Sequence, residues 1–185
     1  GAVVIAGGQG LMPHVNYGRR MPTVYVDIGA LPELVGITEK DGEIAIGALT
    51  VHRTLQRDAI VCRALPLLAY SAAQVGGGWQ VHNRGTVGGN LVAMHPLYDI
   101  APALLALQAG VEIQAPDGVR RAALGKILAE TSHGLGTSSL LTRILLKPMT
   151  SDAGWAYEKL KITAGSYGSA NAAAVVSLNG NKLST

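Results

Sequence analysis

The stretch Arg84-Gly85-Thr86-Val87-Gly88-Gly89-Asn90 sets a pair of glycines between a hydroxyl and an amide side chain. Paired glycines let main-chain N–H groups approach an anion, because no Cβ blocks the way and unusual backbone angles become accessible. The Thr86 hydroxyl and the Asn90 amide add side-chain donors for phosphate oxygens. This stretch therefore predicts a loop that binds phosphate groups.

A second glycine-rich loop lies near the start of the chain, where Ala6-Gly7-Gly8-Gln9-Gly10 follows the apolar run Val3-Val4-Ile5. Alone, this loop is as typical of a tight turn as of a ligand site. Together, the two loops favour a clamp for a diphosphate, in which main-chain dipoles rather than lysines meet the charge of the ligand.

Two common nucleotide motifs fit the sequence poorly. The first loop has the surroundings of a dinucleotide-binding turn, with Asp27 near the place of a ribose ligand. Pro13 occupies the place of the third glycine, however, and Pro13, Gly18 and Pro22 interrupt the segment that would have to form the intervening helix. A phosphate loop is missing too, because an isoleucine follows the Gly-Lys pair at 125–126.

Composition indicates a globular, cytoplasmic protein. Apolar residues make up 48% of the 185 residues, which is enough for a sizeable core. The net charge of +3 comes from 15 basic and 12 acidic residues that form no basic run, which argues against a nucleic-acid groove. No apolar stretch approaches the roughly 18 residues of a membrane helix, and no leader opens the chain, so membrane insertion is not expected.

The chain has a single cysteine, Cys62. One thiol excludes an internal disulfide and also an iron–sulfur cluster held by this chain alone, since such clusters need about four thiolates. Any such cluster must therefore sit on another chain. Cys62 itself lies in the helical pattern of residues 61–65, and we expect it to be a small buried apolar residue.

The remaining pattern mixes short strands with helices. Strands are expected at 23–28, 43–48, 111–114, 119–121 and 140–146, and helices at about 51–57, 65–75 and 99–108. Thr50 and Asp99 are the expected N-caps of the first and last of these helices. The run 175–183 predicts a closing hairpin that turns at Asn179-Gly180. Because both ends fall inside such elements, we interpret the chain as part of a longer polypeptide.

Five stretches taken together resemble the FAD-binding (medium) subunit of molybdenum hydroxylases, the family of the carbon monoxide dehydrogenase medium subunit and the flavin domain of xanthine dehydrogenase. They are Ala6 to Leu11, Val26-Asp27-Ile28 with Leu31 to Leu34, Ile46 to Thr50, Gln80 to Asn90, and Tyr157-Glu158-Lys159-Leu160-Lys161. The resemblance runs nearly end to end. It implies an α+β, PCMH-like fold of two subdomains, at 1–30 and 31–150, which hold FAD between them, followed by the start of an α+β C-terminal domain at 151–185.

The resemblance also implies a set of cofactor-binding residues. By position, Ile5, Ala6, Gly7, Gly8, Gln9, Gly10 and Leu11 would hold the FAD diphosphate from one side, and Thr86, Val87, Gly88, Gly89 and Asn90 from the other. Asp99, Leu140 and Lys159 match flavin contacts, and Tyr157 is equally compatible with the isoalloxazine and with packing. No catalytic side chain and no metal ligand is implied on this chain.

Three positions depart from the family pattern. Gly10 stands where serine is frequent, His95 where aspartate is common, and Gly165-Ser166 where Gly-Asp is frequent. His95 is compatible with tuning of the flavin or a partner surface, although an ordinary loop histidine is favoured. The other histidines, at 14, 52, 82 and 133, lack metal-ligand spacing.

The function implied is that of an electron-transfer flavoprotein subunit, an oxidoreductase component in which FAD takes electrons from iron–sulfur clusters and passes them to an external acceptor. The partners would be an iron–sulfur small subunit and a large subunit with the molybdenum cofactor, arranged as a dimer of heterotrimers. Two alternatives stay open at this point: a stand-alone FAD-dependent reductase of the enolpyruvoyl-sugar type, and an assembly module without flavin.

Overall fold

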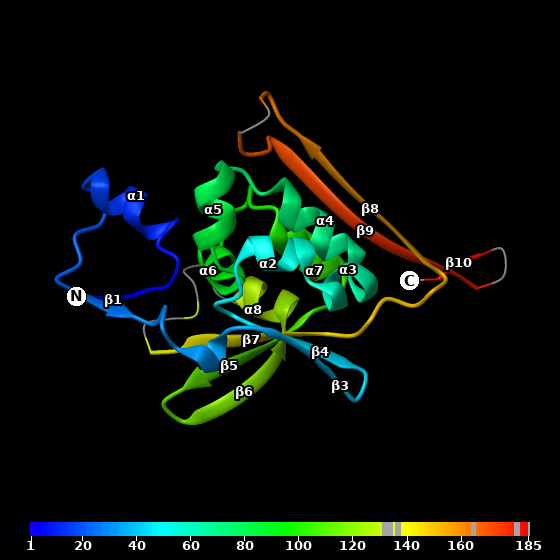
Figure 1. Cartoon of the computed structure of the whole chain (residues 1–185), viewed down its shortest axis with the longest axis horizontal. Helices are drawn as coiled ribbons and strands as arrows, with labels where there is room; N and C mark the ends of the chain where they lie inside the picture. Colours follow the sequence, from blue (N-terminus) through cyan, green and yellow to red (C-terminus); the bar gives the residue numbers. More distant parts are fainter. Residues whose placement is uncertain (131–134, 136–137, 164–165, 180–181, 185) are drawn as a thin grey trace.

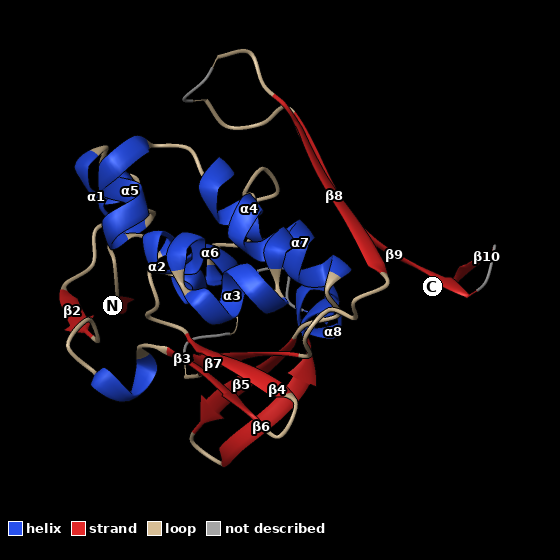
Figure 2. Ribbon diagram, turned by 45° about the vertical axis from the view of Figure 1, so that its right-hand side comes forward, coloured by secondary structure: helices blue, strands red, loops and turns tan. Residues whose placement is uncertain are grey.

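The computed structural model describes residues 1–130, 135, 138–163, 166–179 and 182–184. Figure 1 shows a helical layer above a five-stranded sheet, with a small two-stranded sheet beside the helices and a long hairpin across them. In Figure 2 the helices gather on one face of the five-stranded sheet. Within the described ranges, no helix has the length and apolar character needed to cross a bilayer.

The small sheet is a parallel pair formed by β1 (Ala2–Ile5) and β2 (Val24–Asp27). Parallel neighbours need a crossover, and α1 (Leu11–Asn16) provides it. The expectation that this segment would form no helix was wrong. Pro13 is the third residue of α1 and lies in its first turn. N–H groups in the first turn have no acceptor within the helix, so the N–H that proline lacks costs no helical hydrogen bond. Gly18 and Pro22 lie beyond the end of the helix, so they limit its length only.

The larger sheet is antiparallel and has the order β3-β4-β7-β5-β6. Its strands are β3 (Ile37–Lys40), β4 (Glu43–Gly47), β7 (Leu140–Leu146), β5 (Gly110–Ala115) and β6 (Gly118–Ala123), and the short 3-10 helix η1 (Pro32–Leu34) precedes them. Ile44, Ile46 and Ile144 are fully buried on the face that meets the helices. The sequence therefore located β4, β5, β6 and β7 correctly, but it did not predict β3.

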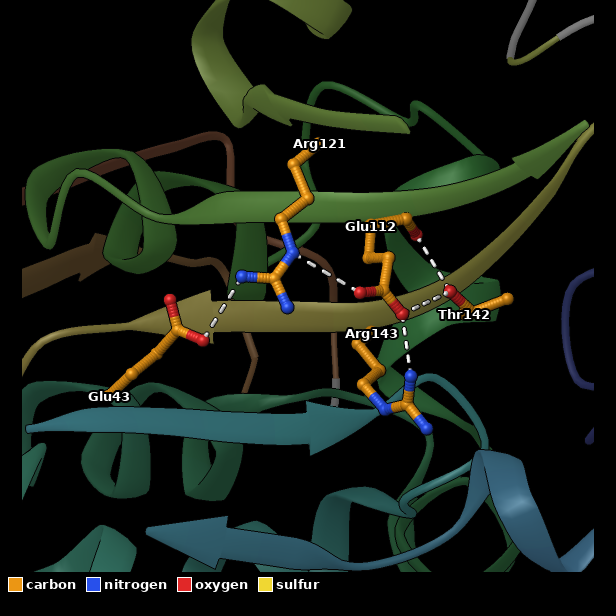
Figure 3. A network of polar contacts seen from close by, with 5 residues as sticks. All are labelled: Glu43, Glu112, Arg121, Thr142 and Arg143. Atoms are coloured by element: carbon orange, nitrogen blue, oxygen red, sulfur yellow. Dashed lines mark hydrogen bonds and ion pairs between the residues drawn. The ribbon is translucent and has the colours of Figure 1, made fainter. Parts of the chain in front are cut away.

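The opposite face of this sheet carries a polar network centred on Glu112 (Figure 3). Its Oε1 accepts from Arg143 Nη1 at 2.6 Å and from the Thr142 hydroxyl at 3.3 Å, and its Oε2 accepts from Arg121 Nε at 3.3 Å. Arg121 also reaches Glu43 at 3.5 Å. Burial alone would raise the pKa of Glu112, but the bonds and charge of Arg143, with help from Arg121 and Thr142, hold it below its ordinary value.

The helical layer supplies most of the core. It consists of α2 (His52–Arg57), α3 (Ala59–Ala64), α4 (Pro66–Gln74), α5 (Gly78–Arg84), α6 (Val87–Val92), α7 (Ile100–Ala106) and α8 (Leu124–Glu130). The sequence predicted α2, α4 and α7. It did not predict α5, α6 or α8. Leu55, Leu68 and Leu104 are fully buried where these helices meet each other and the sheet.

Two local expectations about this layer were wrong. Thr50 does not cap α2, because its hydroxyl exchanges hydrogen bonds of 3.1 Å with the main chain of Gly36. Cys62 is exposed rather than buried, since α3 turns Val61 and Ala64 toward the core and leaves the thiol on the other face.

The C-terminal part is an antiparallel sheet of β8 (Ala153–Leu160), β9 (Ala170–Asn179) and β10 (Lys182–Ser184). The expected closing hairpin is confirmed, with Asn179 opposite Lys182, while Gly180 lies outside the described residues. Tyr157 of β8 packs in a small cluster with Leu67 of α4 and Ala103 of α7. The hairpin is therefore anchored on the helical layer.

Candidate functional site

The two glycine-rich segments meet in the structure. A Cβ placed on Gly7 would lie 1.8 Å from the main-chain oxygen of Arg84 and 3.3 Å from the Cα of Gly85. No side chain fits into such a gap, so the first loop rests directly on the main chain that leads into Thr86. The end of β1 and the end of α5 thus form two sides of one site.

The first loop presents free main-chain donors. Within the part of the chain that the structure describes, the N–H groups of residues 7–10 donate to no protein acceptor. Gly8 has a φ of 72°, a left-handed conformation that glycine adopts without strain. Successive free N–H groups in such a turn form a concave binding surface for an anion.

A cavity of about 360 Å³ lies in front of these donors. This volume is within the usual range of about 300–1,000 Å³ for small-molecule sites. Its lining comes from the first loop, α1, the end of β2 and the end of α5: Ile5, Ala6, Gly7, Gly8, Gln9, Met12, Pro13, Asn16, Asp27 and Arg84. Asp27, which the sequence placed near a ribose position, thus shares the cavity with the glycine loop.

The second glycine segment is a helix start rather than a loop. Its main-chain donors are already engaged: Val87 N–H donates to Thr50 O at 2.9 Å, Gly88 N–H to Ala48 O at 2.8 Å, and Gly89 N–H to the Thr86 hydroxyl at 3.1 Å. Asn90 N–H donates to Thr86 O at 2.9 Å, as in a helix. The expectation that this segment offers main-chain donors to phosphate was therefore wrong.

Residues 86–90 are not among the residues that line the cavity, but two of their side chains keep hydrogen-bonding capacity. Thr86 accepts the bond from Gly89 and keeps its own hydroxyl hydrogen for another acceptor. The Oδ1 atom of Asn90 is buried and has no hydrogen-bond partner among the described residues. A buried polar atom without a partner is costly, so it points to a missing contact. Gly88 has a packing role, because a Cβ there would lie 2.7 Å from the Cβ of Ala48.

Arg84 is a site residue that the sequence reasoning did not assign. Arg84 lines the cavity, and it forms no ion pair within the described ranges. A guanidinium suits phosphate recognition because it presents several donors in a plane. Its position directly before the glycine segment could have indicated this role. The sequence instead indicated that main-chain dipoles would balance the charge of the ligand without a cation.

Three other predicted site residues meet in a buried cluster. Lys159 Nζ lies 2.9 Å from Asp99 Oδ1 and 3.0 Å from Asp99 Oδ2, and it donates to Gln74 O at 3.0 Å. The Tyr157 hydroxyl donates to Asp99 Oδ1 at 2.6 Å. Burial, followed by this bond to Asp99, raises the pKa of Tyr157 far above its ordinary value. The cluster lies apart from the lining of the cavity.

The structure also decides between the roles weighed for these residues. Asp99 stands at the N-cap position of α7 as expected, but its side chain makes no capping bond to the first turn of the helix. Its carboxylate is instead committed to Lys159 and Tyr157. Leu140 opens β7 opposite Gln114 and belongs to neither the cavity lining nor the buried cluster.

The described histidines belong to no cluster of metal ligands. Within the described residues, no three His, Cys, Asp or Glu side chains gather as ligands; His133 falls outside those ranges. His52 is buried, and burial followed by the charge of His82 lowers its pKa to about 4. His95 is exposed but stacks on Tyr98 and Tyr167, with ring centroids 4.7 and 5.4 Å away. Gly165 also lies outside the described residues.

The fold and this cavity define a dinucleotide-binding domain of the flavoprotein class. Residues 1–148 match the family described as FAD binding domain in molybdopterin dehydrogenase. The chain belongs to this family, and the expected α+β FAD-binding fold is confirmed.

Relatives support the same assignment. The chain is 36% identical to the carbon monoxide dehydrogenase medium chain of Hydrogenophaga pseudoflava, over 99% of this chain and 64% of the relative. It is 34% identical to the 6-hydroxypseudooxynicotine dehydrogenase complex subunit alpha of Paenarthrobacter nicotinovorans, over 96% and 60%. The chain therefore spans a little under two thirds of the length of these relatives.

Solved structures agree with the sequence relatives. A carbon monoxide dehydrogenase from Hydrogenophaga pseudoflava that lacks the Mo-pyranopterin moiety matches with a TM-score of 0.94 and 33% identity, over 100% of this chain and 64% of that chain. Quinoline 2-oxidoreductase from Pseudomonas putida 86 matches with a TM-score of 0.88 and 27% identity, over 98% and 63%.

The residues present fit the diphosphate of FAD. Residues 7–9 line the cavity together with Arg84, the N–H groups of residues 7–10 donate to no described protein acceptor, and Arg84 carries a positive charge. These features suit a doubly charged group with several acceptor oxygens. A diphosphate offers only acceptors, so Asn90, which is outside the cavity lining, would have to present its amide nitrogen to it.

Proposed function

We propose that this chain is the FAD-binding electron-transfer subunit of a molybdenum-containing hydroxylase or dehydrogenase. The observation that carries the proposal is the contact between the first glycine loop and the Arg84 end of α5, which sets free N–H groups and a cation around one cavity in a chain of this family. Bound FAD supplies the capacity to accept electrons and release them, and the protein orients it and tunes its electrostatics.

The proposed diphosphate site has two walls with different donors. In the first wall, residues 5–11 surround the phosphates, and residues 7–10 contribute the free main-chain N–H groups. In the second wall, Thr86 and Asn90 contribute side chains, Val87 and Gly88 hold the main chain close to Thr50 and Ala48, and Gly89 donates to the Thr86 hydroxyl. Arg84 stands where the walls meet and balances the negative charge of the phosphates.

We assign the buried cluster to the flavin end of the cofactor. The Asp99 carboxylate accepts from Lys159 and Tyr157 and keeps acceptor capacity for a ligand hydroxyl, since a carboxylate has about four lone-pair sites. Tyr157 is 5% exposed, which supports packing and orientation of Asp99 rather than stacking on the isoalloxazine. Leu140 is proposed as a main-chain contact from the start of β7.

The partners proposed are an iron–sulfur small subunit and a molybdenum-cofactor large subunit in a dimer of heterotrimers. The single cysteine supports a neighbour that holds the clusters. The names of the relatives, which are medium chains and complex subunits, support assembly with other chains. The three sheets support a division into units at 1–30, 31–150 and 151–185.

The test of the proposed site truncates Asn90, the residue of the second wall whose side-chain oxygen has no described hydrogen-bond partner. Asn90→Ala breaks no hydrogen bond of its side chain to a described residue, so the protein should fold with unchanged stability while its affinity for FAD falls roughly tenfold or more. Titration of apoprotein with FAD, followed by flavin fluorescence, measures the affinity. Gly88→Val would be a poor choice, because its side chain would collide with Ala48 and disturb the fold.

The matched control is Asn83→Ala on the preceding helix, where the Asn83 side chain donates to Trp79 O. It should leave FAD affinity unchanged. If the wild-type protein from the intact complex contains no flavin, or if Asn90→Ala binds FAD as tightly as the wild type, the proposed site is wrong.

A further inference from the structure

A tyrosine hydroxyl lies at the end of the first glycine loop. The Oη atom of Tyr98 is 3.8 Å from the position that a Cβ on Gly10 would occupy. Gly10 has a φ of −88° and a ψ of −38°, which any residue adopts, so its backbone does not require glycine. The absent side chain leaves room beside the loop, and the Tyr98 hydroxyl borders that room.

The Tyr98 ring is held from several sides. It stacks on His95 with ring centroids 4.7 Å apart and lies 5.8 Å from the ring of Tyr167. Its main-chain oxygen accepts from Asn171 Nδ2 of β9 at 3.2 Å. The next residue is Asp99 of the buried cluster. Because these contacts fix the ring and its backbone, the hydroxyl has a defined position relative to the loop.

The hydroxyl is also a dependable donor. Burial, followed by the charge of Tyr167 and a hydrogen bond with its side chain, raises the pKa of Tyr98 to about 12. The group therefore keeps its proton at physiological pH. A bound phosphoryl oxygen would replace Tyr167 as the acceptor of this proton. A neutral phenol donates to anionic oxygens, and bonds to charged acceptors are the stronger kind.

We propose that Tyr98 is a diphosphate ligand, whose hydroxyl donates to the phosphoryl oxygen bound next to the Gly10 N–H group. Gly10 offers the main-chain donor at that point, and Tyr98 offers the side-chain donor from another part of the chain. This inference rests on the proposed function, because it places a further donor in the same FAD site. Because Tyr98 precedes Asp99 in the chain, this role of Tyr98 would also connect the glycine loop to the Asp99 cluster.

Tyr98→Phe tests the donor while it keeps the ring and its stacking. In titrations of full-length apoprotein with FAD, followed by flavin fluorescence, the dissociation constant should rise roughly tenfold. Tyr70→Phe, at a tyrosine that packs on Trp155 and Tyr157, is the matched control and should bind as the wild type does. The urea midpoint of both variants should stay at the wild-type value.

The decisive variant adds Gly10→Ser to Tyr98→Phe. Serine suits the backbone at this position, and its hydroxyl would occupy the room that Tyr98 borders. The double variant should recover FAD affinity to within about threefold of the wild type. Wild-type affinity in Tyr98→Phe, or no recovery in the double variant, would overturn the role of Tyr98 alone. Failure of the wild type to bind FAD would overturn the proposed function itself.

Discussion

Lys159 Nζ lies 2.9 Å from Asp99 Oδ1, and both side chains are 3% exposed. The pair joins the start of α7 to β8, which are 60 residues apart in the sequence. A carboxylate in such surroundings depends on its partner, because burial of an unpaired charge is very costly.

Lys159→Met should therefore destabilise the protein strongly. Among the described residues, the remaining Asp99 carboxylate would keep the bond from Tyr157 alone, and removal of one member of a buried pair typically costs roughly 3–5 kcal/mol. Urea denaturation measures the free energy of unfolding. The double variant Asp99→Asn, Lys159→Met should lose less stability than Lys159→Met, since it leaves no unpaired charge buried at this pair. A single variant that loses under about 1 kcal/mol would contradict this account.

Gly7→Ala should separate the two walls of the site. The new methyl group would overlap the main-chain oxygen of Arg84, so the loop or the end of α5 must move. We expect a loss of stability of roughly 1–3 kcal/mol and at least tenfold weaker FAD binding. Gly125→Ala in α8 is the control, because its Cβ would meet only Leu105 at 3.6 Å. Equal FAD affinity in the two variants would argue against close apposition of the walls.

Glu112 should make stability sensitive to acid. Its pKa in the folded protein lies below the ordinary value of 4.5, so its contribution is fully present above that pH and is lost as the pH falls below it. Arg143→Met removes the 2.6 Å bond and should flatten the stability profile in that acidic range. Chemical denaturation at a series of pH values tests this, and an unchanged slope in Arg143→Met would refute it.

His52 should affect the stability of the protein over a higher pH range than Glu112 does. Its pKa falls from 6.5 to about 4 on folding, so the unfolded chain binds its proton first as the pH is lowered. Stability should be unaffected above pH 6.5 and should fall between 6.5 and 4, by roughly 3 kcal/mol at most. His52→Gln should remove much of this slope, whereas His14→Gln, at an exposed position, should retain it.

The sequence located elements whose signal is local. Alternation of isoleucines identified β4, and the Asn179-Gly180 pair identified the closing hairpin. The helix that contains Gly88 and Gly89 could not be found in this way, because glycine is a poor helix former. Its first turn is held by acceptors far along the chain, at Ala48 and Thr50.

In the candidate site, too, local features could be predicted and long-range contacts could not. The first loop was recognisable from its glycines, but its contact with Arg84 joins segments that only the tertiary structure brings together. The exposure of Cys62 depends on the rotation of α3 about its axis, which a short helix does not reveal in sequence. Asp99 was expected as an N-cap because capping is a local role, whereas its partner Lys159 is remote.

The difference between the two walls has a consequence for deuterium uptake. Amides 87–90 are tied to protein acceptors, so they should exchange slowly whether or not cofactor is present. Amides 7–10 have no such tie within the described structure, so they should exchange fast until a ligand accepts from them. Mass spectrometry of peptides from each wall should therefore show that the wall at 87–90 is formed before the ligand binds. The wall at 7–10 should become protected only when the ligand binds.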